Sequence, residues 1–271
     1  MTKASSRRTR WAGLFALLWP AVSVSQSSGI PSYRASQFAC VGFRQHINSL
    51  IRTENGIQSF RETSGRDGVL RVRGTDSSGV LSLRSWFDSL TVWREGPDGK
   101  LQPETGGVVG GRYYGTLDPS GSYTRLDAPF VPPELAQVND VAAALDDMFP
   151  LLPPTGLRVG QVWSDSAGVT LERLPDGTVE GRSVERFRLR AQREGTAPVR
   201  VGDSTLVDAV RSEQETSTIV WDPNGGLLTW DRDIVVDATV AAGGVVPRGV
   251  RSRVEQKIRL DRVALPPGGC S

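Results

Sequence analysis

The residues of this chain that are able to do acid–base chemistry are few and lie far apart. His46 is the single histidine, and it stands inside a run of alternating residues that is typical of a strand. A nucleophilic triad needs a base within reach of a nucleophile and an orienting carboxylate, and no Gly-x-Ser-x-Gly elbow marks a nucleophile. We therefore interpret His46 as a sheet residue, and we expect no catalytic residue and no enzyme activity.

Carboxylates are the second candidates for chemistry. Asp231, Asp233 and Asp237 lie on one face of a predicted strand, and Asp146-Asp147 lie near the end of a predicted helix. Two carboxyl groups at a fixed separation can hydrolyse a glycosidic bond, but acids that alternate along a strand usually form its solvated face. We interpret the three strand aspartates as such a face.

The chain carries no pattern of ligands for a metal ion or a phosphate group. One histidine and two distant cysteines do not supply the three or four clustered ligands that zinc requires. There is no Asp-x-Asp-x-Asp-Gly calcium loop, and the glycine-rich stretch 106–111 lacks the lysine and the helix of a phosphate-binding loop. The sequence thus predicts no metal ion and no cofactor.

The two cysteines, Cys40 and Cys270, lie near opposite ends of the chain. An even number of cysteines in an exported protein favours a disulfide bond. We predict a Cys40–Cys270 bond that fastens the C-terminal tail to the first strand. The alternative is that they are two unrelated small residues, one of them on a frayed tail.

The N-terminus has the layout of a secretory signal peptide. Four basic residues precede the apolar stretch 11–24, and Ser23 and Ser25 supply small side chains before a polar segment. The stretch is shorter than the about 20 apolar residues of a membrane span, and it contains Pro20. We predict cleavage after Ser25, a periplasmic or extracellular protein, and no transmembrane segment in the mature chain.

Removal of this segment changes the charge of the protein. The whole chain has 32 basic and 30 acidic residues; residues 1–25 hold four of the basic ones and none of the acidic ones, which leaves 28 against 30. A protein that binds nucleic acid carries a basic patch or stripe. The mature chain has no basic excess to supply one, so we expect no nucleic-acid partner.

Most of the remaining chain has the pattern of strands separated by tight turns. Apolar and polar residues alternate through residues 37–128 and again through 157–263, and Gly, Asn, Asp and Pro punctuate both regions. The run Gly65-Arg66-Asp67-Gly68 is one of the predicted turns. The stretch 250–263 is the clearest strand, because Val254, Ile258 and Leu260 alternate with charged residues, as on a half-buried antiparallel strand.

One segment has the period of a helix instead. Pro132-Pro133 opens it, Pro150 closes it, and apolar residues between them recur at a spacing of three and four. These residues are Leu135, Val138, Val141, Ala142, Leu145, Met148 and Phe149. We predict an amphipathic helix over residues 134–149, which either covers a β surface or simply fills the core.

Together these elements predict a mainly β protein, built as a long, curved antiparallel sheet that forms an open half-barrel with one amphipathic helix packed against it. Long strands in a twisted sheet coil in this way. The expected order is a signal peptide (1–25), a flexible leader (26–36), a single β-rich domain (37–265) and a C-terminal tail (266–271). Within the domain, two β meanders (about 37–128 and 157–263) flank the helix (134–149).

Two short motifs add a resemblance to known proteins. Residues 157–163 (LRVGQVW) and 221–227 (WDPNGGL) resemble a group of secreted bacterial proteins of unknown function that carry a Val-Gly-x-x-Trp strand and a later Asp-Pro-x-Gly-x-Leu hairpin. That group is similar to lipoprotein carriers of the LolA type. The resemblance covers about residues 150–263, and it implies a curved, incompletely closed sheet that holds acyl chains and carries no catalytic residues.

The sequence leaves two functions open. The first is a non-catalytic cradle or carrier for an apolar ligand, a hydrophobic small molecule or lipid such as an acyl chain, held on an apolar concave face that the helix partly covers. The second is a structural or protein-interaction component of the cell envelope, with a filled core and no ligand. An open concave surface lined by aromatic and aliphatic side chains would separate the two.

Overall fold

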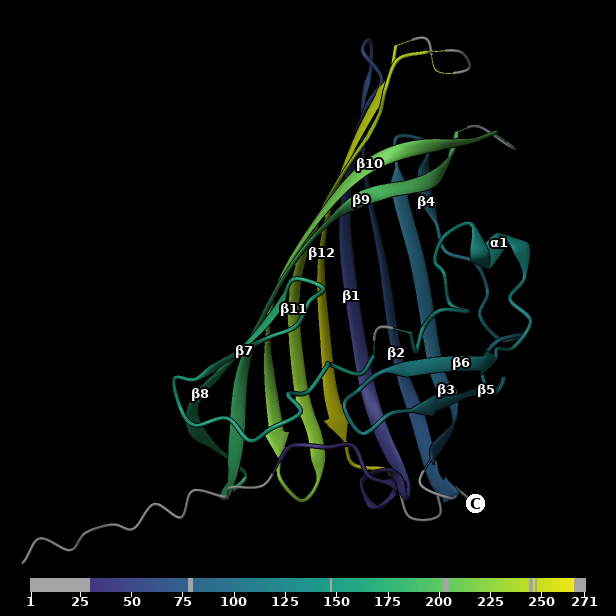
Figure 1. Ribbon diagram of the computed structural model, residues 1–271. Coiled ribbons are helices and arrows are strands. Elements are labelled where there is room, and N and C mark those ends of the chain that lie inside the picture. Colours follow the sequence, from purple (N-terminus) through teal and green to yellow (C-terminus); the bar gives the residue numbers. More distant parts are fainter. Residues whose placement is uncertain are drawn as a thin grey trace, which may run out of the picture.

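The computed structural model describes residues 30–77, 80–146, 148–201, 205–243, 246 and 248–265. In this part of the chain, twelve strands form one antiparallel sheet, in the order β6-β5-β3-β2-β1-β12-β11-β10-β9-β8-β7, with β4 paired to β3. The sheet is strongly curved and stays open between its two edges, β6 and β7 (Figure 1). The predicted mainly β class and open antiparallel sheet are therefore confirmed.

The strands differ widely in length. The long ones are β1 (Val41–Glu54), β2 (Ser59–Ser77), β3 (Val80–Gly96), β8 (Val169–Val179), β9 (Arg182–Val201), β10 (Thr205–Asp222), β11 (Gly226–Val240) and β12 (Val250–Val263). The short ones are β4 (Gly99–Leu101), β5 (Tyr113–Leu117), β6 (Tyr123–Asp127) and β7 (Val162–Ser164). Helical structure in the described residues is limited to a 3-10 helix (Ala35–Phe38) and α1 (Pro133–Ala136).

The order of the strands follows from two meanders that meet in the middle of the sheet. The first runs from β1 outward to the edge strand β6, and the second runs from the other edge strand, β7, back to β12. Strand β12 then pairs with β1 along thirteen residues, from Gly42↔Val263 to Glu54↔Arg251. The connection between the meanders, residues 128–161, crosses the concave side of the sheet (Figure 1).

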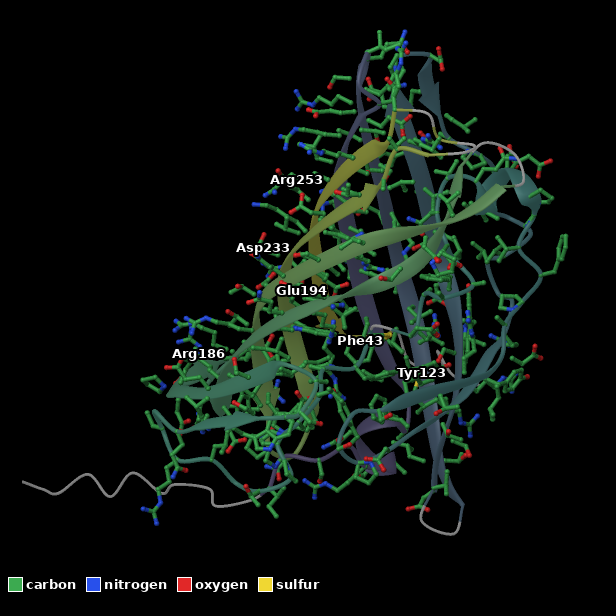
Figure 2. All side chains as sticks on the ribbon, turned by 45° about the horizontal axis from the view of Figure 1, so that its top comes forward. Phe43, Tyr123, Arg186, Glu194, Asp233 and Arg253 are labelled. Carbon is green, nitrogen blue, oxygen red and sulfur yellow. The ribbon has the colours of Figure 1, made fainter. Side chains whose placement is uncertain are left out.

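The period of two in the sequence fixes which side chains face the concavity. In β1, Phe43 and Ile47 are buried, whereas Arg44 and His46 are exposed. Leu260 of β12 is buried beside them, because the register places it opposite Gln45, which is also buried. Figure 2 shows Phe43 and Tyr123 pointing into the space that the sheet encloses, while Asp233 and Arg253 lie on its outer face.

An aromatic cluster fills one end of the concavity. The ring of Tyr33 packs edge-on against Trp221, with centroids 5.1 Å apart, and against Phe149 at 5.8 Å. Phe38 adds a further edge contact to Phe149 at 5.9 Å, a geometry that aromatic rings favour. The Tyr33 hydroxyl donates a hydrogen bond to the carbonyl of Pro150, 3.1 Å away, so the buried phenol is satisfied.

The cluster corrects the prediction of a flexible leader over residues 26–36. Tyr33 is only 2% exposed, and the 3-10 helix Ala35–Phe38 follows it directly. The short polar run around Tyr33 hides one large apolar ring, and burial of that ring decides the conformation of residues 30–36. Residues 26–29 lie outside the described residues.

The predicted helix over residues 134–149 is a second correction, because α1 covers only Pro133–Ala136. From Val141 onward, the backbone hydrogen bonds of the segment span two or three residues instead of four. Asn139 and Asp140 interrupt the helix, and the Asp140 carboxylate accepts a hydrogen bond from the Ala143 N–H at 3.2 Å, in the way such side chains compete with helical bonds. Six of the seven predicted apolar residues still enter the core, namely Leu135, Val138, Val141, Leu145, Met148 and Phe149. Ala142 is only half-buried, and Ala144 packs in the core instead.

The predicted turn at 65–68 is a third correction, because β2 continues through it. A Cβ atom at Gly65 would lie 2.6 Å from the Trp93 ring, and one at Gly68 would lie 2.8 Å from the backbone carbonyl of Ser89. Both glycines therefore serve close packing between β2 and β3 and not a change of chain direction.

The predictions for the two chain ends fall largely outside the described residues. The signal peptide (1–25), the cleavage site and Cys270 are among the residues outside, so the Cys40–Cys270 bond stays a prediction. Cys40 itself is described and lies exposed, one residue before β1. No helix in the described part of the chain is both long enough and apolar enough to cross a membrane.

Candidate functional site

His46 lies on the outer face of β1, where it pairs with a neighbouring strand. The register places it opposite Asp67 of β2, and its Nδ1 atom bonds to the Asp67 carboxylate. The Nδ2 atom of Asn48 lies 2.7 Å from the Nε2 atom of the same ring. Both ring nitrogens are thus engaged by sheet neighbours, which agrees with the interpretation of His46 as a sheet residue.

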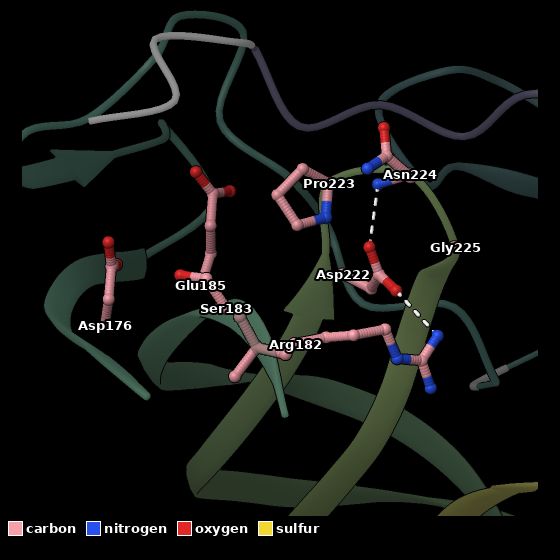
Figure 3. A pocket seen from close by; sticks show the side chains of 9 residues that line it. Asp176, Arg182, Ser183, Glu185, Asp222, Pro223, Asn224 and Gly225 are labelled. Atoms are coloured by element: carbon pink, nitrogen blue, oxygen red, sulfur yellow. Dashed lines mark hydrogen bonds and ion pairs between the residues drawn. The ribbon is translucent and has the colours of Figure 1, made fainter. Parts of the chain in front are cut away.

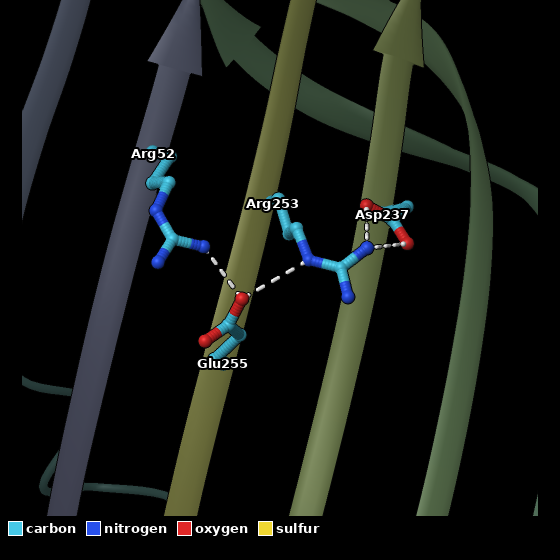
Figure 4. A network of polar contacts seen from close by, with 4 residues as sticks. All are labelled: Arg52, Asp237, Arg253 and Glu255. Carbon is cyan, nitrogen blue, oxygen red and sulfur yellow. Dashed lines mark hydrogen bonds and ion pairs between the residues drawn. The ribbon is translucent and has the colours of Figure 1, made fainter.

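The three aspartates of β11 form cross-strand ion pairs with β12. Asp231 lies 3.5 Å from Arg259, Asp233 lies 3.8 Å from Lys257, and Asp237 lies 3.0 Å from Arg253. Arg253 also binds Glu255 of its own strand, and Glu255 binds Arg52 of β1. These ion pairs therefore connect β11, β12 and β1 (Figure 4). These aspartates are the solvated face of the sheet, as predicted, and each carboxylate is balanced by a cation.

The remaining candidates for chemistry are also engaged or fall outside the described residues. Asp146 lies 3.5 Å from Arg125, and Asp147 lies outside the described residues. Among the residues that the structure describes, no three His, Cys, Asp or Glu side chains gather as metal ligands.

A cavity of about 640 Å³ lies at the hairpin end of β8 to β11 (Figure 3). Its acidic residues have internal partners: Asp222 lies 3.2 Å from Arg182, and the buried Glu185 lies 3.4 Å from Arg173. Asp222 also accepts a hydrogen bond from the Asn224 N–H at 2.9 Å. The Asp-Pro-Asn-Gly motif therefore builds the β10–β11 turn, a structural role.

A groove on the concave face is the better candidate for a binding site. It has a volume of about 490 Å³ and lies between β8–β12 and the segment 121–151. Seven apolar side chains line it: Phe149, Leu151, Val169, Leu189, Trp230, Ile234 and Val236. We call this the apolar compartment.

A smaller cleft of about 270 Å³ adjoins the groove and shares Arg232 and Gln256 with it. Its polar lining includes Gln45, Arg66 and Asn139, and Arg66 donates a hydrogen bond to the Asn139 side chain at 3.0 Å. We call this the polar compartment. The two compartments together form a site with one apolar part and one polar part.

The buried ion pair of Arg232 and Glu215 stands where the two compartments meet. The guanidinium donates two hydrogen bonds to the carboxylate, at 2.8 and 2.9 Å, and the side chains are only 6% and 3% exposed. The guanidinium also lies over the Trp230 ring, 4.2 Å from its centroid, a favourable cation–π contact. Arg232 is thereby held rigidly at the junction.

The other charges of the groove also balance. Glu213 binds Arg193 at 2.7 Å and Arg211 at 2.6 Å. The lining as a whole contains three arginines and three acids: Arg193, Arg211, Arg232, Asp146, Glu213 and Glu215. The groove therefore has no net formal charge to select a charged ligand.

The site contains buried polar atoms that have no hydrogen-bond partner among the described residues. One is Oε1 of Gln45, whose residue is 5% exposed, and another is Nε1 of Trp230. Tyr123, which also lines the groove, keeps its proton, because burial, with the Asp146 charge acting the same way, raises the pKa of its hydroxyl to about 12. The site thus offers one acceptor, Oε1 of Gln45, and one donor, Nε1 of Trp230, that the described residues leave unused.

The expectation of an apolar concave face holds only in part. The aromatic cluster and the 135–149 segment fill the most apolar part of the concavity, and the open part mixes apolar walls with charged and amide groups. A sequence signal for this was present in β11, where Arg232 interrupts an inward row of Trp230, Ile234 and Val236. The alternation that places the three aspartates outward also places Arg232 inward, and Arg232 is a site residue that was not predicted from the sequence.

No protein-family model matches the chain, and no curated protein matches it in sequence. Solved structures with similar arrangements include one described as lipid–protein interactions in lipovitellin (10% identity, TM-score 0.46), where the match covers 85% of this chain but only 26% of that one. A putative outer membrane lipoprotein-sorting protein domain from Vibrio parahaemolyticus matches at 12% identity and TM-score 0.18, over 84% of this chain and 87% of the other.

A LolA superfamily protein from Nitrosomonas europaea matches at 9% identity and TM-score 0.17, over 82% of this chain and 87% of the other. TM-scores this low support no conclusion about function. A function must therefore be inferred from the groove itself.

Proposed function

We propose that this protein is a non-catalytic cradle for an amphipathic lipid-like ligand, whose apolar part lies in the apolar compartment. The observation that carries the proposal is the groove of about 490 Å³ lined by seven apolar side chains. Small-molecule sites have volumes of about 300–1,000 Å³ and mainly apolar walls with a few placed polar groups. The volume of the groove lies in this range, and its walls combine seven apolar side chains with charged and polar groups.

The competing function is a structural envelope protein with a filled core. The aromatic cluster shows that one end of the concavity is indeed filled. The apolar compartment favours the cradle, because its walls come from β8, β9 and β11 and from the crossing segment, yet they leave space between them. Export from the cytoplasm belongs to the same proposal and is supported by the N-terminal sequence pattern.

A fluorescent fatty acid tests the proposal directly. We expect saturable binding by the purified protein, and we expect Val236→Trp to abolish it, because the indole would occupy the apolar compartment. Val235→Trp is the matched control, since the neighbouring residue of the same strand points to the opposite face. Absence of saturable binding, or equal binding by Val236→Trp and wild type, would leave the structural function as the better one.

A further inference from the structure

The two compartments of the groove call for different chemistry from a ligand. The apolar compartment presents seven aromatic and aliphatic side chains beside charged groups that have ion-pair partners, whereas the polar compartment presents amide and guanidinium groups beside Ile47 and Ile258. They meet at Arg232 and Gln256, which line both. The seven apolar side chains suit an apolar chain, and the amide groups of the polar compartment suit a polar head.

The charges of the polar compartment disfavour an ionic head. Its lining carries Arg66 and Arg232 as cations and Asp140 as an anion, and Arg232 already donates two hydrogen bonds to the Glu215 carboxylate, which neutralises it. The formal charges cancel once Glu215 is included. A charged head group would lose its hydration without gaining an unpaired counter-charge.

Gln45 supplies the specific observation. Its side chain is buried and lines the polar compartment, yet its Oε1 atom accepts no hydrogen bond from the described residues. A buried amide oxygen without a donor is unfavourable, and native proteins rarely leave one unsatisfied. A hydroxyl of a bound head group would provide the missing donor.

Resting on the proposed function, we propose that the ligand is a neutral acylated polyol. Its acyl chain occupies the apolar compartment, and its hydroxyl-bearing head occupies the polar compartment and donates a hydrogen bond to Gln45. Asn139 and Arg66 lie in the same lining and offer further polar contacts to the head.

The test is a displacement titration with three competitors of equal chain length: a monoacylglycerol, the free fatty acid and the fatty acid methyl ester. We expect the monoacylglycerol to displace the fluorescent probe at the lowest concentration. We expect Gln45→Met to weaken the monoacylglycerol by about 2- to 10-fold, the loss of one neutral hydrogen bond, and to leave the methyl ester unchanged. Gln214→Met is the matched control. Gln214 is exposed on the outer face of β10, away from the groove that Glu215 lines, so this variant should behave as wild type.

The outcomes separate this inference from the proposed function. If the free fatty acid binds best, or if Gln45→Met leaves the monoacylglycerol unaffected, the polyol head is overturned while the cradle remains. The second result would mean that water alone satisfies Gln45. If no competitor displaces the probe and the probe itself does not saturate, the proposed function fails together with this inference.

Discussion

The Arg232–Glu215 pair shows at the scale of single residues how the concave face tolerates charge. Each partner is nearly inaccessible to water, and each satisfies the other with two hydrogen bonds. Removal of one partner from such a pair leaves an uncompensated buried charge, which typically costs about 3–5 kcal/mol. The pair thus links the stability of the sheet to the geometry of the groove.

We predict that Glu215→Gln lowers the free energy of unfolding by about 3 kcal/mol, measured by urea denaturation. Asp233→Asn is the control, because Asp233 is mostly exposed and lies 3.8 Å from Lys257; such a surface pair contributes little. The double variant Arg232→Met/Glu215→Met removes both charges and should recover most of the loss. Equal stability of Glu215→Gln and wild type would contradict the buried-pair interpretation.

Replacement of Gln45 should raise the free energy of unfolding, whereas replacement of Glu215 lowers it. The Oε1 atom of the buried Gln45 amide accepts no hydrogen bond from the described residues, so Gln45→Met removes an unsatisfied acceptor and keeps most of the volume. We expect the free energy of unfolding of the ligand-free protein to rise by about 1 kcal/mol, measured by the same denaturation. A decrease instead would mean that the amide stabilises the sheet itself, and would assign Gln45 a structural role.

Part of the site could be predicted from the sequence. The period of two along β11 identified Asp231, Asp233 and Asp237 as the outer face, and their ion pairs confirm it. The same period places Arg232 inward, but its partner Glu215 lies on another strand. The pairing of β10 with β11 brings the charges together. It places Glu215 opposite Ile234, which is the next inward residue of β11 after Arg232.

Among the elements, β2 illustrates how a glycine can be misread. Gly65 and Gly68 predict a turn by composition, yet both lie within one continuous strand of nineteen residues. The cause is non-local, since the Trp93 ring of β3 occupies the place of a Gly65 side chain. Similarly, the apolar spacing of residues 134–149 predicted the buried side chains correctly but the helix wrongly, because a stretch of short turns around Asn139 and Asp140 also presents those side chains to the core.

We predict that Gly65→Val destabilises the protein by about 1–3 kcal/mol, because the added side chain would collide with the Trp93 ring. Gly195→Ala in β9 is the matched control. A Cβ atom there meets no atom within 4 Å, and the substitution should be neutral or slightly stabilising. Thermal denaturation of both variants measures the difference, and a fully stable Gly65→Val would show that Trp93 can move aside.

In the whole molecule, the first strand and the last strand pair in the centre of the sheet. Strand β1 pairs with β12 in register over thirteen residues, although about 200 residues separate them, a pairing that must overcome a large loop-closure entropy. Local alternation predicts which residues face inward on each strand, but it does not specify partners between distant strands. The long strands and the open curvature followed from sequence, whereas the central β1–β12 junction did not.

The predicted Cys40–Cys270 bond would stabilise this junction between β1 and β12. Cys40 lies one residue before β1, next to the end of β12 at Val263. A bond there would lock both strands of the junction, and it would close a loop of about 230 residues, for which chain entropy gives an upper stabilisation of about 5 kcal/mol.

Intact-mass measurement of the exported protein, alkylated under denaturing and non-reducing conditions, checks this prediction together with the cleavage site. We expect a chain that starts at Gln26 and carries no alkyl group, and a reduced sample that carries two. Two alkyl groups without reduction would show free thiols, and a mass that includes residues 1–25 would show that the signal peptide is retained.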